Sequence, residues 1–288
     1  MIEEREFRDL GCPWPLRGSQ SFDYDSRAVG DRLAIGVWAP PKAHLERGGA
    51  KDAPLDLVYV LDASWKLGIA ASLCYLQYVD RVNPGFAPVL LVGVDYPVDR
   101  TNARTRDYTM VDAVPVAMVD KAAAPELTPG GADKFLEFLE DELDPFIRSR
   151  YPVADRPAGI LGNSYGGTFT FYAFLRQSRL FDRYWLGSPG LFTTGTDHIA
   201  QVEARLKGDL VHPTKMFLSI GSLEIDGGFA IYEDLGRHFT RLVDALKRTP
   251  NRQLQWTSKI YDGYTHTSVL APAINDALLR LYGSKAPI

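Results

Sequence analysis

The sequence predicts an α/β protein with a mostly parallel central sheet and helices on both faces. Apolar, β-branched runs recur along the 288 residues with helical segments between them, an alternation typical of parallel sheets. Several runs are apolar throughout, as strands covered on both faces are. One junction between a run and a helical segment carries the pattern Gly-x-Ser-x-Gly. We expect a single domain spanning residues 1–288.

The predicted strands are short apolar runs bounded by turn-forming or charged residues. They are Leu33–Trp38, Leu55–Leu61, Pro88–Val94, Ala158–Leu161, Tyr184–Leu186, Met216–Ile220 and Trp256–Tyr261.

The predicted helices show apolar residues at helical intervals. In Ala132–Arg148, apolar and acidic side chains fall on opposite faces, and Pro145 should kink or break the last turn. The others are Ile69–Val79, Thr168–Leu180, Ile199–Leu206, Ile231–Arg248 and Ala273–Tyr282.

Three irregular segments complete the predicted topology. Ala43–Pro54 is rich in glycine and charge and reads as a surface hairpin loop. Asp95–Thr128 and Gly187–Asp197 are longer, and we expect them to build the rim of an active site.

Composition excludes several classes of function. The net charge of −4 and pI near 5.8 are not those of a nucleic-acid-binding protein. Cys12 and Cys74 are too few for a disulfide framework, and no Cys/His metal pattern, phosphate loop or dinucleotide fingerprint occurs. The acidic start Met1–Glu6 and the lack of a membrane-length apolar run predict a cytoplasmic protein, unless a targeting segment has been removed.

The pentapeptide Gly162-Asn163-Ser164-Tyr165-Gly166 is the strongest functional signal. Between a strand and a helix, this pattern forms the nucleophile elbow of an α/β-hydrolase. The nucleophile occupies a strained backbone conformation there, and its close neighbours must be small. We therefore predict the α/β-hydrolase fold with Ser164 as nucleophile.

A serine nucleophile needs a base, and in this fold the base follows the acid in the chain. His238 and His266 both come late enough. His238 falls inside an amphipathic helix and reads as a packed or surface residue. His266 lies in a loop between the last predicted strand and the final helix, so we predict that it is the base.

The acid has two candidates. Glu224 and Asp226 both follow the strand Met216–Ile220, and ligands bind at such carboxyl ends of parallel strands. We favour Glu224, although Asp226 and a Ser–His pair without a direct acid both stay open.

The oxyanion hole takes one backbone N–H from the residue after the nucleophile and another from a loop after an early strand. These rules select Tyr165 and Ser64. Trp65 would then lie at the site entrance, with core packing as the alternative.

A set of short stretches supports a family resemblance. They are Tyr59–Asp62, Val92–Pro97, Arg106–Thr109, Gly130–Leu136, Ser149–Val153, Gly162–Gly166, Leu180–Tyr184, Ser188–Pro189, Gly263–His266 and Ser268–Val269. In these stretches, which run from about residue 55 to the end, the chain resembles the putative-esterase (esterase D-like) family of α/β-hydrolases, and within it the enterochelin and salmochelin esterase branch. The resemblance implies carboxylester hydrolysis, with Ser164, His266 and Glu224 matching the family's nucleophile, base and glutamate.

The chain departs from the family pattern twice. Asn163 stands where a histidine often precedes the nucleophile, and Gly190-Leu191-Phe192 replaces a tryptophan-rich segment. Three arginines, Arg100, Arg104 and Arg106, crowd a segment expected to border the cleft. They could hold an anionic substrate, with Arg106 as the substrate-binding candidate. The alternative is a solvated loop with Arg106 in an internal salt bridge.

The sequence as a whole predicts a serine carboxylesterase that acts through an acyl-enzyme on a small-molecule ester, possessing no cofactor or metal. The ester is expected to be of the siderophore type or otherwise bulky. An acyltransferase using the same residues is one alternative, and a non-catalytic binding protein is another. Binding to nucleic acid or to a membrane is not expected, and the oligomeric state is left open.

Overall fold

A single eight-stranded sheet organises the part of the chain that the computed structural model describes, which is residues 16–47, 52–82, 85–98, 103–110, 129–191 and 196–284. The strand order is β1-β2-β4-β3-β5-β6-β7-β8. The strands are β1 Ser19–Ser26, β2 Asp31–Trp38, β3 Asp56–Leu61, β4 Val89–Asp95, β5 Ala158–Asn163, β6 Phe181–Gly187, β7 Thr214–Gly221 and β8 Leu254–Tyr261. All seven predicted strands are present.

The sheet is mostly parallel, as predicted. From β4 through β3, β5, β6 and β7 to β8 every pairing is parallel, and only the β1–β2 and β2–β4 pairings are antiparallel. The edge strand β1 escaped the sequence analysis because its sequence, SQSFDYDS, is polar and most of it is exposed. Its alternating Phe22 and Tyr24 pack against the helix that ends at Arg150.

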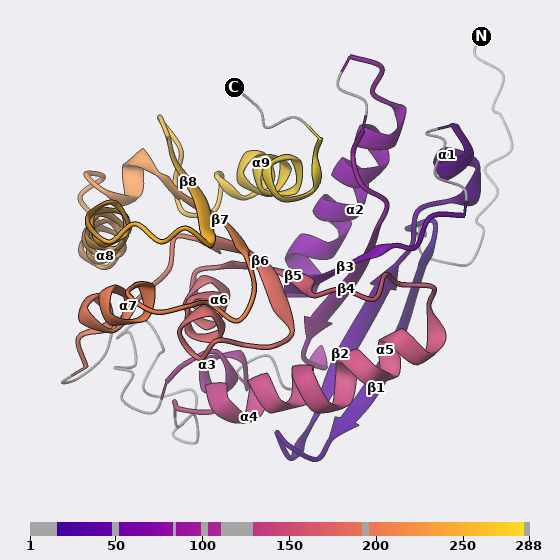
Figure 1. The fold of residues 1–288 in the computed structure, drawn as a ribbon, viewed down its shortest axis with the longest axis horizontal. Helices are drawn as coiled ribbons and strands as arrows, with labels where there is room; N and C mark the ends of the chain where they lie inside the picture. Colours follow the sequence, from indigo (N-terminus) through magenta and orange to yellow (C-terminus); the bar gives the residue numbers. More distant parts are fainter. Residues whose placement is uncertain are drawn as a thin grey trace, which may run out of the picture.

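Helices cover both faces of the sheet (Figure 1). The helical elements are α1 Lys42–Arg47, α2 Ala63–Val79, α3 Ala103–Asp107, α4 Ala132–Glu137, η2 Phe138–Leu143, α5 Asp144–Arg150, α6 Tyr165–Leu175, α7 His198–Leu206, η3 Ser222–Glu224, α8 Ala230–Arg248 and α9 Leu270–Tyr282. α2 and α9 enclose one hydrophobic core, which includes Cys74 and Trp185. The helices α4 to α8 enclose a larger core on the opposite face. No helix among the described residues has both the length and the apolarity to cross a membrane.

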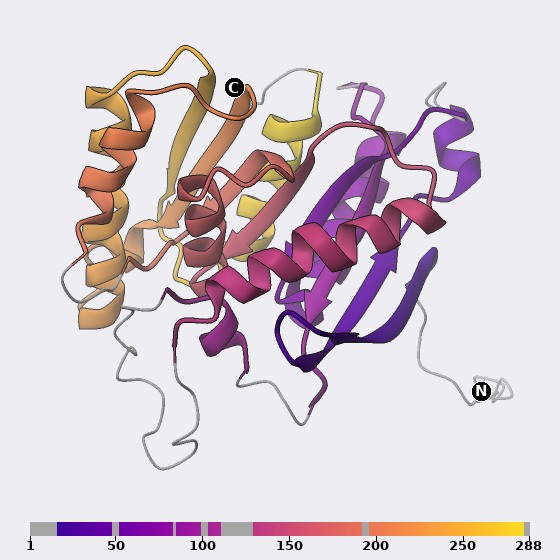
Figure 2. The same ribbon diagram turned by 60° about the horizontal axis from the view of Figure 1, so that its bottom comes forward.

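The long amphipathic helix predicted over Ala132–Arg148 is continuous, and the expected break at Pro145 is wrong. Figure 2 shows α4, η2 and α5 in line across the sheet. The middle section is a π-helix, where the N–H of Asp144 donates to the carbonyl of Leu139. Pro145 is the second residue of α5, directly after the π-helical section, where the hydrogen-bond pattern already departs from that of an α-helix.

Three other boundaries differ from the predictions. α2 begins at Ala63, not at Ile69, because the strand turns into the helix at a single residue, Asp62. α6 begins directly after Ser164 and ends at Leu175 instead of Leu180. The segment Ala43–Pro54 is not a hairpin loop, since β4 separates β2 from β3 in the sheet and α1 occupies its start.

The parallel strands deliver their carboxyl ends to one edge of the sheet, as the fold class requires. β5 ends at Asn163, β6 at Gly187 and β7 at Gly221. In the sheet Asn163 pairs with Gly187, and Gly187 pairs with Ser219 close to the end of β7. Residues that follow these strands are therefore gathered at one edge.

We predict that Phe169→Ala destabilises the protein by about 3 to 5 kcal/mol through cavity formation. Phe169 is fully buried on α6, and its ring contacts Tyr108 and Phe135. Chemical denaturation measures the change. The control Val82→Ala, at a side chain 92% exposed, should stay within about 0.5 kcal/mol of wild type. Equal effects from the two substitutions would contradict the packing described.

Candidate active site

Ser164 occupies a sharp turn between β5 and α6. Its backbone adopts φ 60° and ψ −126°, which is costly for a residue with a Cβ and typical of strained functional positions. The Ser164 N–H donates to the carbonyl of Gly187 at 2.9 Å. A Cβ at Gly162 would lie 2.1 Å from the carbonyl oxygen of Gly166, so only glycine fits there. The local structure is that of the predicted elbow, with the Ser164 side chain at the start of a helix.

Glu224 and His266 form a hydrogen-bonded pair. The Nδ1 of His266 lies 2.6 Å from Oε2 of Glu224. The Glu224 side chain is fully buried. Its other oxygen, Oε1, accepts hydrogen bonds from Ser188 Oγ and from the N–H of Gly221, each at 2.9 Å. A buried carboxylate in this position fixes the imidazole orientation and stabilises a positive charge on the ring.

The other candidates for acid and base lie elsewhere. Asp226 is exposed, and the pair that His266 makes is with Glu224. His238 is half-buried on α8. Burial, together with the nearby charges of Arg241 and Arg237, lowers the pKa of His238 to about 4. His238 is thus a packed neutral imidazole, which agrees with the sequence analysis.

Aromatic side chains pack beside His266. The ring of Tyr232 stacks on His266 with centroids 4.8 Å apart, and Phe229 packs on Tyr232. Leu223 and Tyr264, whose backbones are joined by a hydrogen bond, are exposed on the same loops. This border could receive an apolar or aromatic part of a substrate.

The oxyanion donor predicted at Ser64 is already engaged. The N–H of Ser64 donates to Oδ2 of Asp95 at 2.6 Å, so the structure contradicts this assignment as it stands. The cause is Asp95, the last residue of the neighbouring strand β4, whose carboxylate meets the start of α2. Tyr165, the other predicted donor, is the first residue of α6, at the positive end of a helix.

Trp65 is 65% exposed, which rules out the alternative of core packing. Beside it lies Arg104, whose guanidinium carbon is 5.8 Å from the Trp65 ring and 5.2 Å from the Tyr165 ring. Trp65 and the first residue of α6 therefore share Arg104 as a neighbour, and the place of Trp65 at a site entrance stays a prediction.

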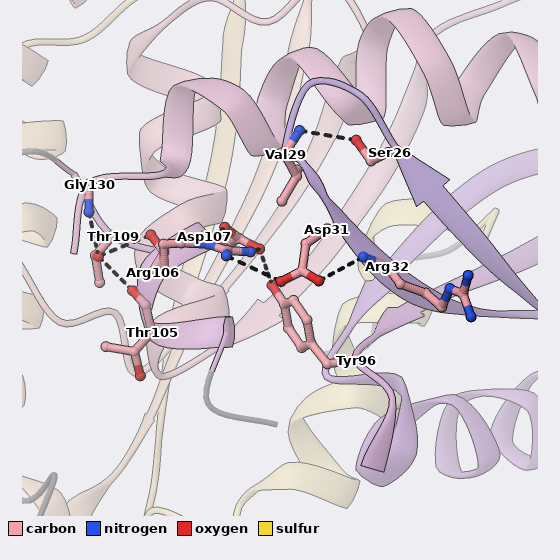
Figure 3. A network of polar contacts seen from close by, with 10 residues as sticks. All are labelled: Ser26, Val29, Asp31, Arg32, Tyr96, Thr105, Arg106, Asp107, Thr109 and Gly130. Carbon is pink, nitrogen blue, oxygen red and sulfur yellow. Dashed lines mark hydrogen bonds and ion pairs between the residues drawn. The ribbon is translucent and has the colours of Figure 1, made fainter. Parts of the chain in front are cut away.

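Arg106 belongs to an internal ion-pair network (Figure 3). Its guanidinium donates to both carboxylate oxygens of Asp107, at 2.6 and 3.0 Å, and to Asp31 at 3.2 Å. Asp107 is buried and also accepts from the hydroxyl of Tyr96. These contacts favour the internal salt bridge over the substrate-binding role predicted for Arg106. Arg100 and Phe192 lie outside the described residues.

Several residues around the site were missed by the sequence analysis. Ser188, Tyr232 and Asp95 contact candidate residues from distant parts of the chain. Ser188 lay in a stretch that resembled the esterase family, which was a usable signal. Among the described residues, no group of three or more His, Cys, Asp or Glu side chains is arranged to hold a metal ion.

Curated relatives carry names that describe siderophore esterases. The chain is 28% identical over 180 residues to the ferri-bacillibactin esterase BesA of Bacillus subtilis, a match that covers 58% of this chain and 60% of that protein. It is 26% identical over 185 residues to the siderophore triacetylfusarinine C esterase of Aspergillus fumigatus, covering 64% of this chain and 60% of that protein. The matches thus span about three fifths of each relative.

Solved structures share the fold over nearly the whole chain. The BES protein from Bacillus cereus superimposes with a TM-score of 0.77 at 21% identity, covering 99% of this chain and 100% of that one. An IroE-like serine hydrolase from Shewanella oneidensis gives a TM-score of 0.74 at 25% identity, covering 92% and 80%. The protein therefore has the α/β-hydrolase fold of these proteins.

A family model described as "Putative esterase" matches residues 26–267. This range runs from the end of β1 to the residue after His266 and includes the elbow and Glu224. The chain belongs to the putative esterase family.

Proposed function

We propose that the protein is a serine carboxylesterase that cleaves a bulky ester through an acyl-enzyme intermediate. The observation that carries the proposal is the pairing of Glu224 Oε2 with His266 Nδ1 at 2.6 Å, at the sheet edge where the strained Ser164 turn begins α6. Nucleophile, base and acid occur in the chain order of the fold.

The reaction proceeds in two halves. Ser164 Oγ attacks the ester carbonyl while Nε2 of His266 accepts its proton, and Glu224 stabilises the imidazolium. His266 then protonates the departing alcohol, which leaves the acyl group on Ser164. A water molecule, deprotonated by His266, attacks the acyl-enzyme, and the acid product departs as Ser164 regains its proton. This chemistry uses only water as a co-reactant.

We further propose a siderophore-type ester as the substrate class. Two curated relatives are named as esterases for siderophores. The exposed aromatic side chains Trp65, Phe229 and Tyr264 would suit the flat rings or apolar arms of such molecules. A cytoplasmic location is the accompanying proposal, which rests on the sequence alone.

Ser164→Ala and His266→Ala should each lower kcat by at least about 10³-fold, because both side chains take part in the reaction itself. Hydrolysis of p-nitrophenyl acetate measures this loss. Thermal stability should change little. Ser149→Ala and His212→Ala serve as matched controls, since both residues lie away from the site and form hydrogen bonds to backbone carbonyl groups. A Ser164→Ala protein that turns over near the wild-type rate would exclude the mechanism.

Glu224→Gln should lower kcat by roughly 10- to 10³-fold, a smaller loss than removal of the nucleophile or base. Its amide would disturb the orientation of His266 and could not stabilise the imidazolium as a carboxylate does. Asp226→Asn, at an exposed side chain, should stay within about twofold of wild type. The reverse ranking in steady-state kinetics would transfer the acid role to Asp226.

An ester panel tests the substrate class. We expect a higher kcat/KM for a tri-catecholate lactone than for feruloyl or short acyl esters. Arg106→Ala should leave the ratio of KM values for charged and neutral esters unchanged, because its donors are bound to Asp107 and Asp31. A rise in KM for charged esters alone would make Arg106 a binding residue. A preference for short neutral esters would remove the siderophore assignment.

A further inference from the structure

The start of α2 lies directly beside the elbow. β3 and β5 are neighbours in the sheet, with Val60 paired to Leu161. A Cβ built on Gly166 would lie 3.2 Å from Oδ2 of Asp62. The starts of α2 and α6 are therefore neighbours at this edge of the sheet, and this is where the fold takes the two donors of an oxyanion hole.

Three of the first four N–H groups of α2 have a hydrogen-bond acceptor. Those of Trp65 and Lys66 donate to the carbonyl of Asp62. That of Ser64 donates to Asp95. Within the described part of the chain, the Ala63 N–H is the one at this helix start that has no hydrogen-bond partner. It is a preformed hydrogen-bond donor at the N-terminus of α2, where the helix dipole favours a negative charge.

The direction of the Ala63 N–H depends on Asp62. The peptide that carries it joins Asp62 to Ala63, and Asp62 adopts φ 54° and ψ 55°. This left-handed conformation is uncommon for a residue with a Cβ, although aspartate tolerates it better than most residues, and the surroundings of Asp62 reinforce it. The side chain of Asp62 shows what enforces it here.

Two cations hold the Asp62 carboxylate. Lys66 Nζ lies 2.5 Å from Oδ2, and Arg104 donates from Nε to Oδ1 at 2.6 Å and from Nη2 to Oδ2 at 3.1 Å. Lys66 and Asp62 are almost completely buried. Burial alone would raise the pKa of Asp62, but the charges of Lys66 and Arg104 outweigh it and lower the pKa to about 2. The carboxylate thus stays ionised and anchored from both sides.

A buried ion cluster of this kind is a poor device for stability alone, since desolvation offsets much of the attraction. The cluster does, however, hold the side chain of Asp62 in place and so fixes the Asp62 backbone conformation. Arg104 also lies over the rings of Trp65 and Tyr165, so a single side chain spans the starts of α2 and α6.

We propose that Asp62, Lys66 and Arg104 act as positioning residues that hold the Ala63 N–H as the second donor to the oxyanion. This inference rests on the proposed esterase function and replaces the donor predicted at Ser64. Arg104 acts through Asp62 and does not bind the substrate.

The test compares p-nitrophenyl acetate with its thiono analogue, in which sulfur replaces the carbonyl oxygen and accepts hydrogen bonds poorly. Arg104→Gln should lower kcat for the oxygen ester by about tenfold or more, leave KM within about twofold, and lower the oxygen-to-sulfur rate ratio by a similar factor. Arg148→Gln is the matched control. Arg148 also pairs with an aspartate, Asp144, and its side chain is 26% exposed against 20% for Arg104. Its rate ratio should equal that of wild type.

Two further variants keep the test decisive. If Arg104→Gln folds poorly, Asp62→Asn takes its place in the test. This substitution keeps the shape of the side chain and should also lower the oxygen-to-sulfur rate ratio. Asp95→Ala releases the Ser64 N–H, and a rise in the oxygen-ester rate there would assign the oxyanion to Ser64 and overturn the inference.

The remaining outcomes separate the inference from the proposed function. A rate ratio unchanged in Arg104→Gln and Asp62→Asn, with wild type active and showing a burst of p-nitrophenol, overturns the inference and leaves the esterase mechanism intact. A KM increase confined to anionic esters would make Arg104 a binding residue and also overturns it. A wild-type protein with neither burst nor turnover removes both.

Discussion

The buried carboxylate of Glu224 is the interaction on which the candidate site depends. It accepts hydrogen bonds from Ser188 after β6 and from Gly221 at the end of β7, and it pairs with His266 in the loop after β8. A fully buried carboxylate left without donors would be very costly. These hydrogen bonds therefore connect the ends of β6 and β7 to the loop after β8 and hold the imidazole of His266 in a fixed orientation.

Backbone strain is concentrated at the same edge of the sheet. Asp62, Ser164 and Ser188 all have positive φ values, of 54°, 60° and 40°, and each stands directly after a strand. Each turn is held by contacts from elsewhere in the fold: the ion pairs of Asp62, the Gly187 carbonyl for Ser164 and the Glu224 carboxylate for Ser188. The hydrophobic cores on both faces of the sheet stabilise the fold enough to offset the free-energy cost of this strain.

The sequence predicted the strands and the chain order of the site because those depend on local patterns. Continuous apolar runs marked the parallel strands, and glycines around Ser164 marked the elbow. The polar edge strand β1 carried no such pattern. Helix starts at Ala63 and Tyr165 were placed too late, since strained single-residue turns leave little trace in composition.

Contacts between distant residues set the limits of prediction at the site. Ser64 binds Asp95, which lies 31 positions away in the chain. Arg106 binds Asp31, which lies 75 positions away. No spacing rule relates such residues, because the sheet order that brings them together is not a local property. Glu224 could be preferred to Asp226 from its position, but its burial and its 2.6 Å contact with His266 required the structure.

The proposed serine mechanism is tested most simply by identifying the residue that a fluorophosphonate probe modifies in the folded protein. Peptide mass spectrometry locates the adduct. The proposed mechanism predicts a single adduct on Ser164, lost in Ser164→Ala and formed much more slowly in His266→Ala, because the imidazole must accept the proton of the attacking hydroxyl. A folded, ester-hydrolysing protein that carries its adduct on another residue, or carries none, would contradict it.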